Sequence, residues 1–289
     1  MVIVRLNGGV GNQLFQFACG RAIALDRKEK LFLDLALLKY EHQNIVNREF
    51  KLGRLTDFEI ADEDRLSVFE SLYEHGNAIV ISDDFLKESF VSVLADKNIK
   101  AILLDGFFQD EFYFLKYRKL IRKEFKKMLN YYLRNNPLKD MDTGKEIVSI
   151  HLRRGDYLFA GVMKVLGICK LDYYQEAVAI IKSQVEDPHF YIFSDDPDQA
   201  DELFADLLDS KTNFSAVVYN KDLPDGDLVE LAVMSRCKHF ILANSSYSWW
   251  GAYLSDSQSK IVVAPKKWAK DEEFIRLSDA IGLESWIRI

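Results

Sequence analysis

The sequence predicts an α/β protein built from two Rossmann-like domains with parallel sheets. Short apolar runs, each long enough for one buried strand, alternate with segments of helical periodicity in both halves of the chain. A polar segment at residues 135–146 separates the halves, and 289 residues is a length typical of about two domains. We therefore expect an N-terminal domain at residues 1–140 and a C-terminal domain at 141–289.

The first half opens with a strand, a glycine loop, a helix and a second strand. The strands are expected at residues 2–6 and 31–34, and the helix at 13–26. This order predicts a right-handed βαβ unit. After this unit the hydrophobic pattern is weaker. It predicts short strands at 78–81 and 101–104, followed by one long amphipathic helix at residues 112–133.

The second half alternates more regularly. Strands are expected at residues 147–152, 189–193, 216–219, 239–243 and 261–264, and helices at 172–184, 197–208, 227–237 and 246–254. Five short apolar runs separated by helices indicate a parallel, doubly wound sheet. Facing the first domain, this second one would leave a cleft between them.

Composition narrows the class of protein. The chain has 38 Lys and Arg against 45 Asp and Glu, a formal net charge of −7, which argues against general nucleic-acid binding. Its three cysteines lie in apolar sequence without zinc-binding spacing, as expected for reduced thiols. The N-terminus reads as a strand rather than a signal peptide, and no apolar run approaches the ~18 residues that a membrane span needs. These features predict a cytoplasmic protein.

The most informative stretch is a strand end that continues into the run His-Leu-Arg-Arg-Gly-Asp-Tyr. His151 and Arg153 share one strand face, and Gly155 permits a sharp turn. We expect Arg153 to point out of the sheet edge, where open α/β sheets bind ligands, and Arg is suited to holding a phosphate bidentately. Arg154 should lie in the turn and pair with Asp156. A purely structural salt bridge among these residues is an equally good interpretation.

A glycine-rich turn, with Gly9, Gly11 and Asn12, precedes the first helix. Backbone amides at such a position can approach a phosphate or a sugar, and the Asn12 amide can bind sugar hydroxyls. Asp34 ends the next strand, as the ribose-binding acid does in dinucleotide-binding folds, but the fingerprint fails at its third glycine, where Leu14 stands. A tight turn without a ligand is the alternative.

Ser194, Asp195 and Asp196 follow the strand at 189–193. We expect Asp195 to contact a ligand and Asp196 to cap the next helix, since Asp is a good N-cap. The two D-x-D patterns of this half lie at helix starts, so capping explains them better than a metal site, and no metal ligands are expected.

Asn244, Ser245 and Ser246 lie between a strand and a helix. Their hydroxyl and amide groups, together with the helix N-terminus, make a second candidate anion site. Trp249 and Trp250 follow, and either stack on a sugar or pack the helix onto the sheet.

Together, four motifs resemble the α-1,2-fucosyltransferases of glycosyltransferase family 11. They are Gly-Gly-Val-Gly-Asn-Gln-Leu-Phe-Gln at 8–16, His-Leu-Arg-Arg-Gly-Asp-Tyr at 151–157, Phe-Ser-Asp-Asp at 193–196 and Asn-Ser-Ser-Tyr-Ser-Trp-Trp at 244–250. They occur in family order over most of the chain. The resemblance implies a GT-B-like fold with two facing domains, the first on the acceptor side and the second binding GDP-fucose. Fucose would pass with inversion to the 2-hydroxyl of a terminal galactose, with no metal and no cofactor beyond the donor.

The resemblance also implies roles for single residues. Arg153 would grip the β-phosphate of GDP, with His151 beside it, whereas Asp156 is a candidate base by position only. Asn12 would contact fucose or pyrophosphate, Asp195 the nucleoside, and Ser245 and Ser246 the phosphates. The expected catalytic residues are His151, Arg153, Arg154 and Asp156, and the expected donor-binding residues are Gly9, Gly11, Asn12, Ser194, Asp195, Asn244, Ser245 and Ser246.

Two other classes remain open from the sequence. A nicotinamide-dependent oxidoreductase would explain only the glycine loop, and a non-catalytic sugar-binding protein would not need paired arginines. The expected partners are GDP-fucose and a galactose-terminated oligosaccharide or lipid-linked glycan, without nucleic acid. The basic segment at 116–127 predicts a solvated helix face, and peripheral docking to the inner face of an anionic membrane is the sharper alternative. Without a membrane anchor of the vertebrate kind, a bacterial cytoplasmic enzyme is expected.

Overall fold

The computed structural model describes residues 1–38, 48–84, 87–134, 145–205, 207, 214–218, 225–271 and 281–289. The chain divides into two compact units, Met1–Phe125 and Lys126–Ile289. This division falls inside a helix, whereas residues 135–144, which hold most of the expected linker and the expected boundary at 140, lie outside the described residues.

The first unit is built around a five-stranded parallel sheet in the order β3-β2-β1-β5-β4. Its strands are β1 (Val2–Arg5), β2 (Leu31–Asp34), β3 (Glu59–Ile60), β4 (Ala78–Ile81) and β5 (Ala101–Leu104). Its helices are α1 (Val10–Arg27), α2 (Glu63–Glu74) and α3 (Lys87–Ala95), with 3₁₀ turns η1 (Ala36–Leu38), η2 (Glu111–Tyr113) and η3 (Leu115–Tyr117). The central strand β1 is apolar and buried from Val2 to Val4, as parallel strands usually are, and ends at the partly exposed Arg5.

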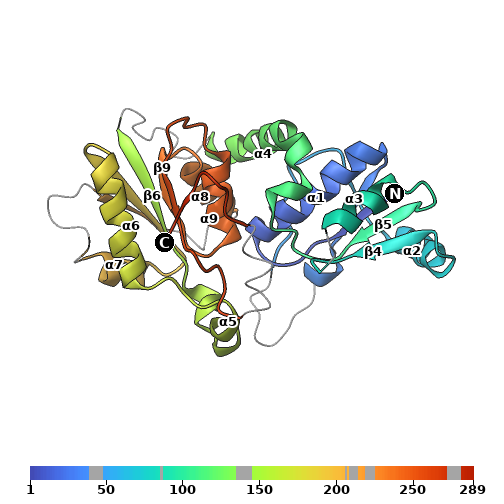
Figure 1. Cartoon of the computed structure of the whole chain (residues 1–289), viewed down its shortest axis with the longest axis horizontal. Coiled ribbons are helices and arrows are strands. Elements are labelled where there is room, and N and C mark those ends of the chain that lie inside the picture. Colours follow the sequence, from blue (N-terminus) through green and yellow to red (C-terminus); the bar gives the residue numbers. More distant parts are fainter. Residues whose placement is uncertain are drawn as a thin grey trace. The chain divides into compact units, whose positions relative to one another are not determined.

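The second unit is built around a six-stranded parallel sheet in the order β11-β10-β9-β6-β7-β8, of which β6 and β9 are labelled in Figure 1. Its strands are β6 (Glu146–Leu152), β7 (Pro188–Ser194), β8 (Phe214–Val218), β9 (His239–Ile241), β10 (Val262–Ala264) and β11 (Ile287–Arg288). Helix α4 (Arg118–Leu133) leads into it, and the others are η5 (Gly155–Leu158), α5 (Ala160–Val165), α6 (Leu171–Gln184), α7 (Pro197–Ala205), α8 (Gly226–Met234) and α9 (Ser246–Leu254).

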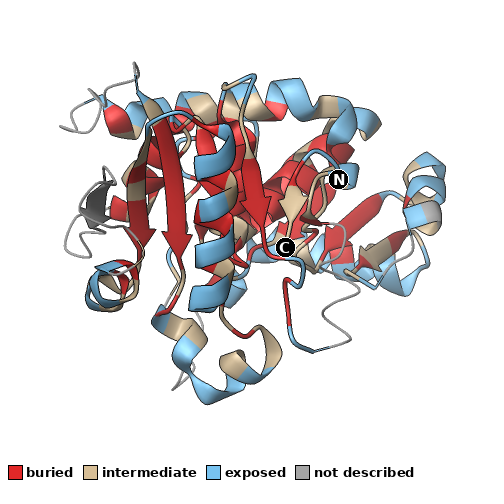
Figure 2. Cartoon of the chain, turned by 60° about the vertical axis from the view of Figure 1, so that its left-hand side comes forward, coloured by how far each residue is buried: buried red, intermediate tan, exposed pale blue. Residues whose placement is uncertain are grey.

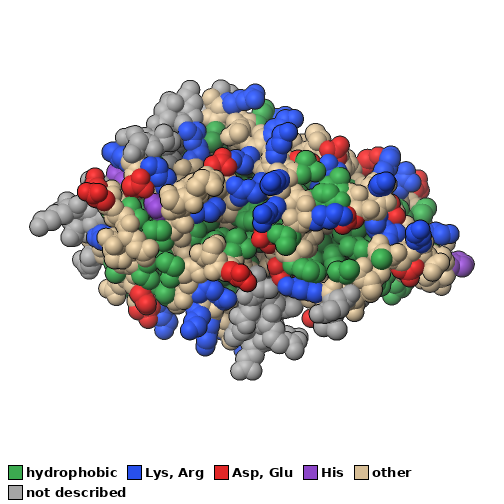
Figure 3. Space-filling view, turned by 45° about the horizontal axis from the view of Figure 1, so that its top comes forward, with side chains coloured by type: hydrophobic (Ala, Val, Ile, Leu, Met, Phe, Trp, Pro, Cys, Tyr) green, Lys and Arg blue, Asp and Glu red, His purple; other side chains and the backbone are tan. Residues whose placement is uncertain are grey.

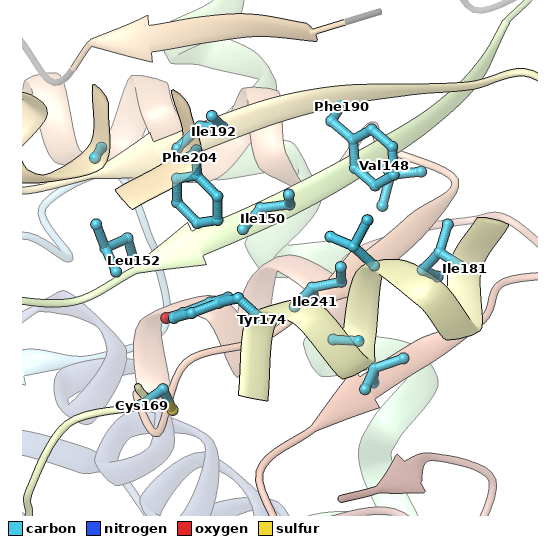
Figure 4. Close-up of a cluster of buried hydrophobic side chains, with 14 of the residues drawn as sticks. Val148, Ile150, Leu152, Cys169, Tyr174, Ile181, Phe190, Ile192, Phe204 and Ile241 are labelled. Atoms are coloured by element: carbon cyan, nitrogen blue, oxygen red, sulfur yellow. The ribbon is translucent and has the colours of Figure 1, made fainter. Parts of the chain in front are cut away.

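The core of the second unit determines which side chains of β6 point inward. Val148, Ile150 and Leu152 point into one apolar cluster, where they pack with Tyr174 of α6 and Phe204 of α7 (Figure 4). Since successive side chains of a strand alternate, the intervening residues of β6 point to the opposite face. Figure 2 shows the result at the centre of the sheet: β6 and β9 are buried along almost their whole length, while the covering helix α6 is buried on one side and exposed on the other.

The structure confirms the predicted class, α/β with two parallel sheets, and the predicted strands of both halves to within a few residues. The predicted helix at 112–133 is wrong at its start: α4 begins only at Arg118, and η2 and η3 precede it. The backbone of Phe114, with φ −134° and ψ 10°, interrupts the helical path. Several short elements were not predicted, namely β3, β11, α2, α3 and α5.

No helix in the described part of the chain is both long and apolar enough to cross a membrane. The three cysteines are buried free thiols, as their apolar surroundings predict. Burial raises the pKa of the Cys169 thiol to about 11, so it stays protonated at neutral pH.

Candidate active site

The strand order of the second sheet creates a topological switch point between β6 and β9. From β6 the chain adds β7 and β8 on one side, and then returns to add β9, β10 and β11 on the other. The loops after β6 and β9 therefore leave in opposite directions, which opens the crevice where doubly wound sheets bind ligands. Three of the predicted motifs follow β6, β7 and β9, so the structure brings them to this edge.

Arg153 is the first residue after β6, and its guanidinium lies between two carboxylates. Nη1 is 2.7 Å from Asp195 Oδ2, and Nη2 donates to Asp156 Oδ1 at 2.5 Å. The group also lies over the Tyr157 ring, 5.3 Å from its centroid. Burial disfavours its charge, but the two aspartates outweigh this and raise its pKa, so Arg153 is a fixed cation at the sheet edge.

The expected pair between Arg154 and Asp156 is wrong, because Asp156 binds Arg153 instead. Gly155 has φ +25°, and the short η5 turn that starts there carries Asp156 back beneath Arg153. The Arg154 side chain is buried, with Nη1 donating to the Arg153 carbonyl at 3.1 Å. Its backbone N–H donates to Asp195 Oδ1 at 2.8 Å.

Asp195 and Asp196 have different partners. The predicted cap at Asp196 is present. Asp196 Oδ1 accepts from the Gln199 N–H at 3.1 Å and its Oδ2 from the Gln199 amide at 2.7 Å, so it caps α7. Both oxygens of Asp195 are engaged by the two arginines: Oδ2 by the Arg153 guanidinium and Oδ1 by the Arg154 backbone N–H. The Ser194 hydroxyl is buried and bonds with the backbone of Asp196. In this structure Asp195 therefore orients Arg153, while its expected contact with a nucleoside stays a prediction.

Close to Arg153 lie the buried side chains of His151 and Glu230, together with the partly buried Tyr247. The His151 ring is 5.6 Å from the Tyr247 ring, and its buried Nδ1 has no hydrogen-bond partner among the described residues. Burial, with a contribution from the charge of Arg153, lowers the pKa of His151 to about 3 and keeps it neutral. The Tyr247 hydroxyl donates to the Asp227 carbonyl at 2.6 Å and lies 3.3 Å from Glu230 Oε2.

Glu230 is the residue that sequence reasoning missed. Burial raises its pKa to about 8, although the Tyr247 hydrogen bond acts in the opposite direction, so the carboxyl group is largely protonated at neutral pH. The available signal was its position as the only charged residue in the apolar run 228–234 of α8. A lone acid in a buried helix usually has a partner or a function.

Asn244 organises the loops around the site. Its Nδ2 donates to the carbonyls of Leu166, Gly167 and Trp268, each at 3.2 Å. The backbone carbonyl of Asn244 accepts from the Tyr157 hydroxyl at 3.0 Å. The side-chain amide predicted to bind the donor is thus committed to the protein backbone.

Ser245 is the N-cap of α9, and its hydroxyl accepts from the Tyr247 N–H at 3.4 Å. Ser246 is the first residue of the helix and is partly exposed, so it lies at the positive end of the helix dipole. Trp249 and Trp250 are fully buried and in contact with each other, which makes them packing residues rather than a sugar platform.

The glycine loop belongs to the first unit. Helix α1 begins at Val10, earlier than predicted, so Gly11 and Asn12 lie in its first turn and Gly9 is the N-cap. Gln109 donates to Asn12 Oδ1 at 2.8 Å. The loop is tied down by Gln13 Nε2, which donates to the carbonyls of Gly8 and Glu49.

Asp34 does not act as a free ribose-binding acid. One oxygen is bound by Arg5 Nε at 2.9 Å, and the other accepts from the Ala36 N–H at 2.9 Å. Among the described residues, no three His, Cys, Asp or Glu side chains are placed to hold a metal ion.

The fold, with its two parallel α/β sheets, is that of the GT-B glycosyltransferases. Residues 1–289 match the family model described as glycosyl transferase family 11, and the chain belongs to this family. It is 28% identical to an α-1,2-colitosyltransferase of Escherichia coli over 297 residues, which cover 100% of this chain and 99% of the relative. It is 30% identical to the E. coli O-antigen biosynthesis glycosyltransferase WbnK over 98% of this chain and 99% of that protein.

A vertebrate relative and a solved structure extend this result. Human galactoside α-(1,2)-fucosyltransferase 1 is 24% identical over 98% of this chain and 73% of its own length. The crystal structure of the NodZ α-1,6-fucosyltransferase with GDP aligns with a TM-score of 0.50 at 13% identity, covering 88% of this chain and 92% of NodZ. This likeness supports the fold assignment.

Proposed function

We propose that this protein is an inverting fucosyltransferase that moves L-fucose from GDP-fucose to the 2-hydroxyl of a terminal galactose in a glycan. The observation that carries the proposal is Arg153, a guanidinium fixed between two carboxylates at the switch point of the second sheet. Membership of family 11 supports a glycosyl transfer, and two of the relatives are named as α-1,2-transferases. The nicotinamide and sugar-binding alternatives explain neither the arginine site nor the family match.

In the proposed reaction the acceptor 2-hydroxyl attacks C1 of fucose on the face opposite the diphosphate. The bond from C1 to the β-phosphate oxygen breaks, its electron pair stays with GDP, and the hydroxyl proton passes to a base. Because negative charge grows on the leaving diphosphate, Arg153 binds the transition state more strongly than the ground state. Asp156 and Asp195 hold the guanidinium in position, so little reorganisation is needed.

The other predicted residues take supporting roles in this proposal. His151 is neutral and adds no charge at the site. Asp156 is engaged by Arg153, so we assign it to positioning rather than to the base. The backbone of Arg154 aligns Asp195, and Ser245 and Ser246 present the N-terminus of α9 to the phosphates.

The donor test measures GDP release with GDP-fucose across a set of galactosides. Release that depends on a β-galactoside, with a product sensitive to an α-1,2-fucosidase, is expected. Because one relative is named for colitose, the nucleotide-linked form of that sugar is the second donor to assay. Faster transfer of colitose would keep the site assignment and change the sugar. A melting temperature raised by NAD(P) but not by GDP would contradict the proposal.

We also propose that transfer needs no divalent metal. Arg153 supplies the positive charge that a metal otherwise gives to a departing diphosphate. Activity should persist in excess EDTA. Loss of activity that manganese restores would contradict this, and would direct attention to the D-x-D pairs at the starts of α7 and α8.

A further inference from the structure

The outer face of helix α4 is basic and partly apolar. Its buried face packs through Ile121, Phe125, Met128 and Leu129, and the opposite face exposes three lysines, Lys119, Lys123 and Lys127, spaced four residues apart. Residues at this spacing form one row along a helix, so the three ammonium groups lie on one side. Figure 3 shows Lys and Arg side chains gathered across the middle of the face that it brings forward, with hydrophobic side chains beside them.

These lysines are not used in the ion pairs found for this segment. In the described part of the chain, Lys116 pairs with Asp26 and Lys126 with Asp256, whereas the structure gives Lys119, Lys123 and Lys127 no carboxylate partner. The only acid in α4 is Glu124, which is bound by Arg21. The row therefore carries uncompensated positive charge on a protein whose net charge is −7.

Large apolar side chains flank the lysine row. Leu120 is 37% exposed and Tyr131 is 45% exposed, and both lie on the same side of the helix because eleven residues are close to three full turns. Leu115, in the turn just before α4, is 47% exposed. A helix face with lysines beside exposed apolar groups is typical of segments that lie in a membrane interface.

We infer that the outer face of α4, defined by Lys119, Leu120, Lys123, Lys127 and Tyr131, docks onto an anionic lipid surface. The lysines meet the headgroup phosphates, and Leu120 and Tyr131 enter the boundary with the acyl chains. Charge complementarity selects this occupant. A second copy of the chain would set lysine rows against each other in a symmetric pair, and like charges repel.

The inference goes beyond the proposed function and does not depend on it. It bears on where the acceptor is met, because a transferase docked on a membrane works on glycans presented at that surface. It also predicts that docking and nucleotide binding are separable properties of the protein.

The test is flotation of the full chain with vesicles at low salt. Vesicles of phosphatidylcholine with about 30% phosphatidylglycerol should bind the protein, and pure phosphatidylcholine should not. Each lysine near an anionic surface contributes about fivefold to partitioning, so Lys119→Glu, Lys123→Glu and Lys127→Glu together should lower it at least about a hundredfold. Raising the salt concentration should weaken binding of the wild type, because it shortens the range of the attraction.

A matched control changes three exposed lysines elsewhere, Lys97→Glu, Lys164→Glu and Lys170→Glu, with the same change in net charge. This variant should float like the wild type. Equal loss in both triple variants would reduce the effect to net charge and overturn the inference. All three proteins should unfold at closely similar temperatures, which shows that the variants are folded.

Two further outcomes decide the mode of docking. Leu120→Ser with Tyr131→Ser should weaken flotation about tenfold or more, since removing buried apolar groups costs interfacial affinity. Unchanged flotation of this double variant would refute the insertion of Leu120 and Tyr131 into the lipid. No vesicle binding at low salt, or binding to a single-stranded oligonucleotide instead of vesicles, would overturn the assignment to lipid.

Discussion

The carboxyl edges of the two sheets carry the same ion-pair pattern, yet we assign the leaving diphosphate to only one of them. In the first unit Arg5, at the end of β1, donates from Nε to Asp34 and from Nη1 to Asp105, both at 2.9 Å. In the second unit Arg153 holds two aspartates at similar distances and with similar exposure. A guanidinium between two carboxylates is therefore not sufficient to define an anion site.

The surroundings of the two arginines differ. Near Arg5 there is a third carboxyl group, Asp83, whose pKa is raised by burial and by neighbouring carboxylates, including Asp105. Near Arg153 there is a second cation, Arg154, and the buried acid Glu230, whose pKa Arg153 influences, is largely protonated. In our proposal the second edge accepts a diphosphate, whereas at the first edge Asp83 and Asp105 add carboxyl groups close to each other. The comparison teaches that the buried neighbours decide what a partly buried arginine can bind.

The largest expected effect separates the two arginines directly. Arg153→Ala should lower kcat by about 10²–10³, or roughly 2.7–4 kcal/mol in transition-state stabilisation, because one preorganised donor to the leaving group is lost. Arg153→Lys should recover little, since the forked geometry is absent. Arg5→Ala is the matched control and should change kcat by only a few fold. The measurement is steady-state GDP release, with melting curves to confirm folding.

Two results would break the comparison. If folded Arg153→Ala kept more than about a tenth of the wild-type kcat, the assignment of Arg153 would be wrong. If Arg5→Ala lost as much activity as Arg153→Ala while staying folded, the first edge would belong to the reaction centre as well.

Much of the second edge follows from the sequence, because strand ends are encoded locally. The apolar run of β6 stops where the polar run begins, and the alternation of side chains places His151 and Arg153 together. Parallel sheets then bring such ends to one edge, so three motifs can be predicted to meet. The cap at Asp196 is equally local, since it depends on residues three positions apart.

Other features depend on contacts that the sequence does not encode locally. The partner of Asp156 is decided by the backbone turn at Gly155, and the contact of Glu230 with Tyr247 joins two helices. Helix α2 was not predicted because only Phe69 is buried along it, so its acidic sequence lacks a clear apolar stripe. Strands β3 and β11 span two residues each, too short to give a periodic signal.

The next prediction concerns Glu230, which carries no negative charge at the second edge while it is protonated. The pKa of Glu230 is raised from 4.5 to about 8 by burial, so the folded protein holds a proton that the unfolded chain has released between these values. Its stabilising contribution is fully present below pH 4.5 and is lost as the pH rises through about 8. The free energy of unfolding should therefore fall by up to about 1.4 kcal/mol per pH unit within this window.

Glu230→Gln removes this proton and should flatten the pH dependence, measured by urea unfolding at several pH values. Glu202→Gln, an exposed acid on α7, should leave the wild-type slope unchanged. A Glu230→Gln protein with the same slope as wild type would show that another group is responsible.

A smaller effect tests how the loop holds Arg153. A Cβ at residue 155 would lie 2.3 Å from Asp195 Oδ2, and the backbone there has φ +25°. Gly155→Ala should therefore cost about 1–3 kcal/mol of stability and lower kcat, because Asp195 must move away from Arg153. At the first edge, Gly106 is approached in the same way by Asp83, at 2.9 Å, so Gly106→Ala should lose stability with little change in kcat.

Gly161→Ala is the control for this pair, since nothing lies within 4 Å of its added Cβ. It should be neutral or slightly stabilising, because alanine is favoured over glycine in a helix. Equal losses of kcat in Gly155→Ala and Gly106→Ala would remove the distinction between the two edges.

The smallest effect isolates the hydrogen bond behind Arg153. Tyr247→Phe keeps the ring against His151 but removes the hydroxyl, which donates to the Asp227 carbonyl and lies 3.3 Å from Glu230 Oε2, and should cost about 0.5–1.5 kcal/mol. Since the Tyr247 hydrogen bond lowers the pKa of Glu230, its loss should raise this pKa further and move the pH-dependent fall in stability to higher pH. Tyr173→Phe is the matched control, because its hydroxyl donates to the Leu242 carbonyl at 2.6 Å and does not contact Glu230. Both variants should lose similar stability at acidic pH, but only Tyr247→Phe should shift the pH profile. An unshifted profile would mean that Tyr247 stabilises the helices without tuning the charge of the site.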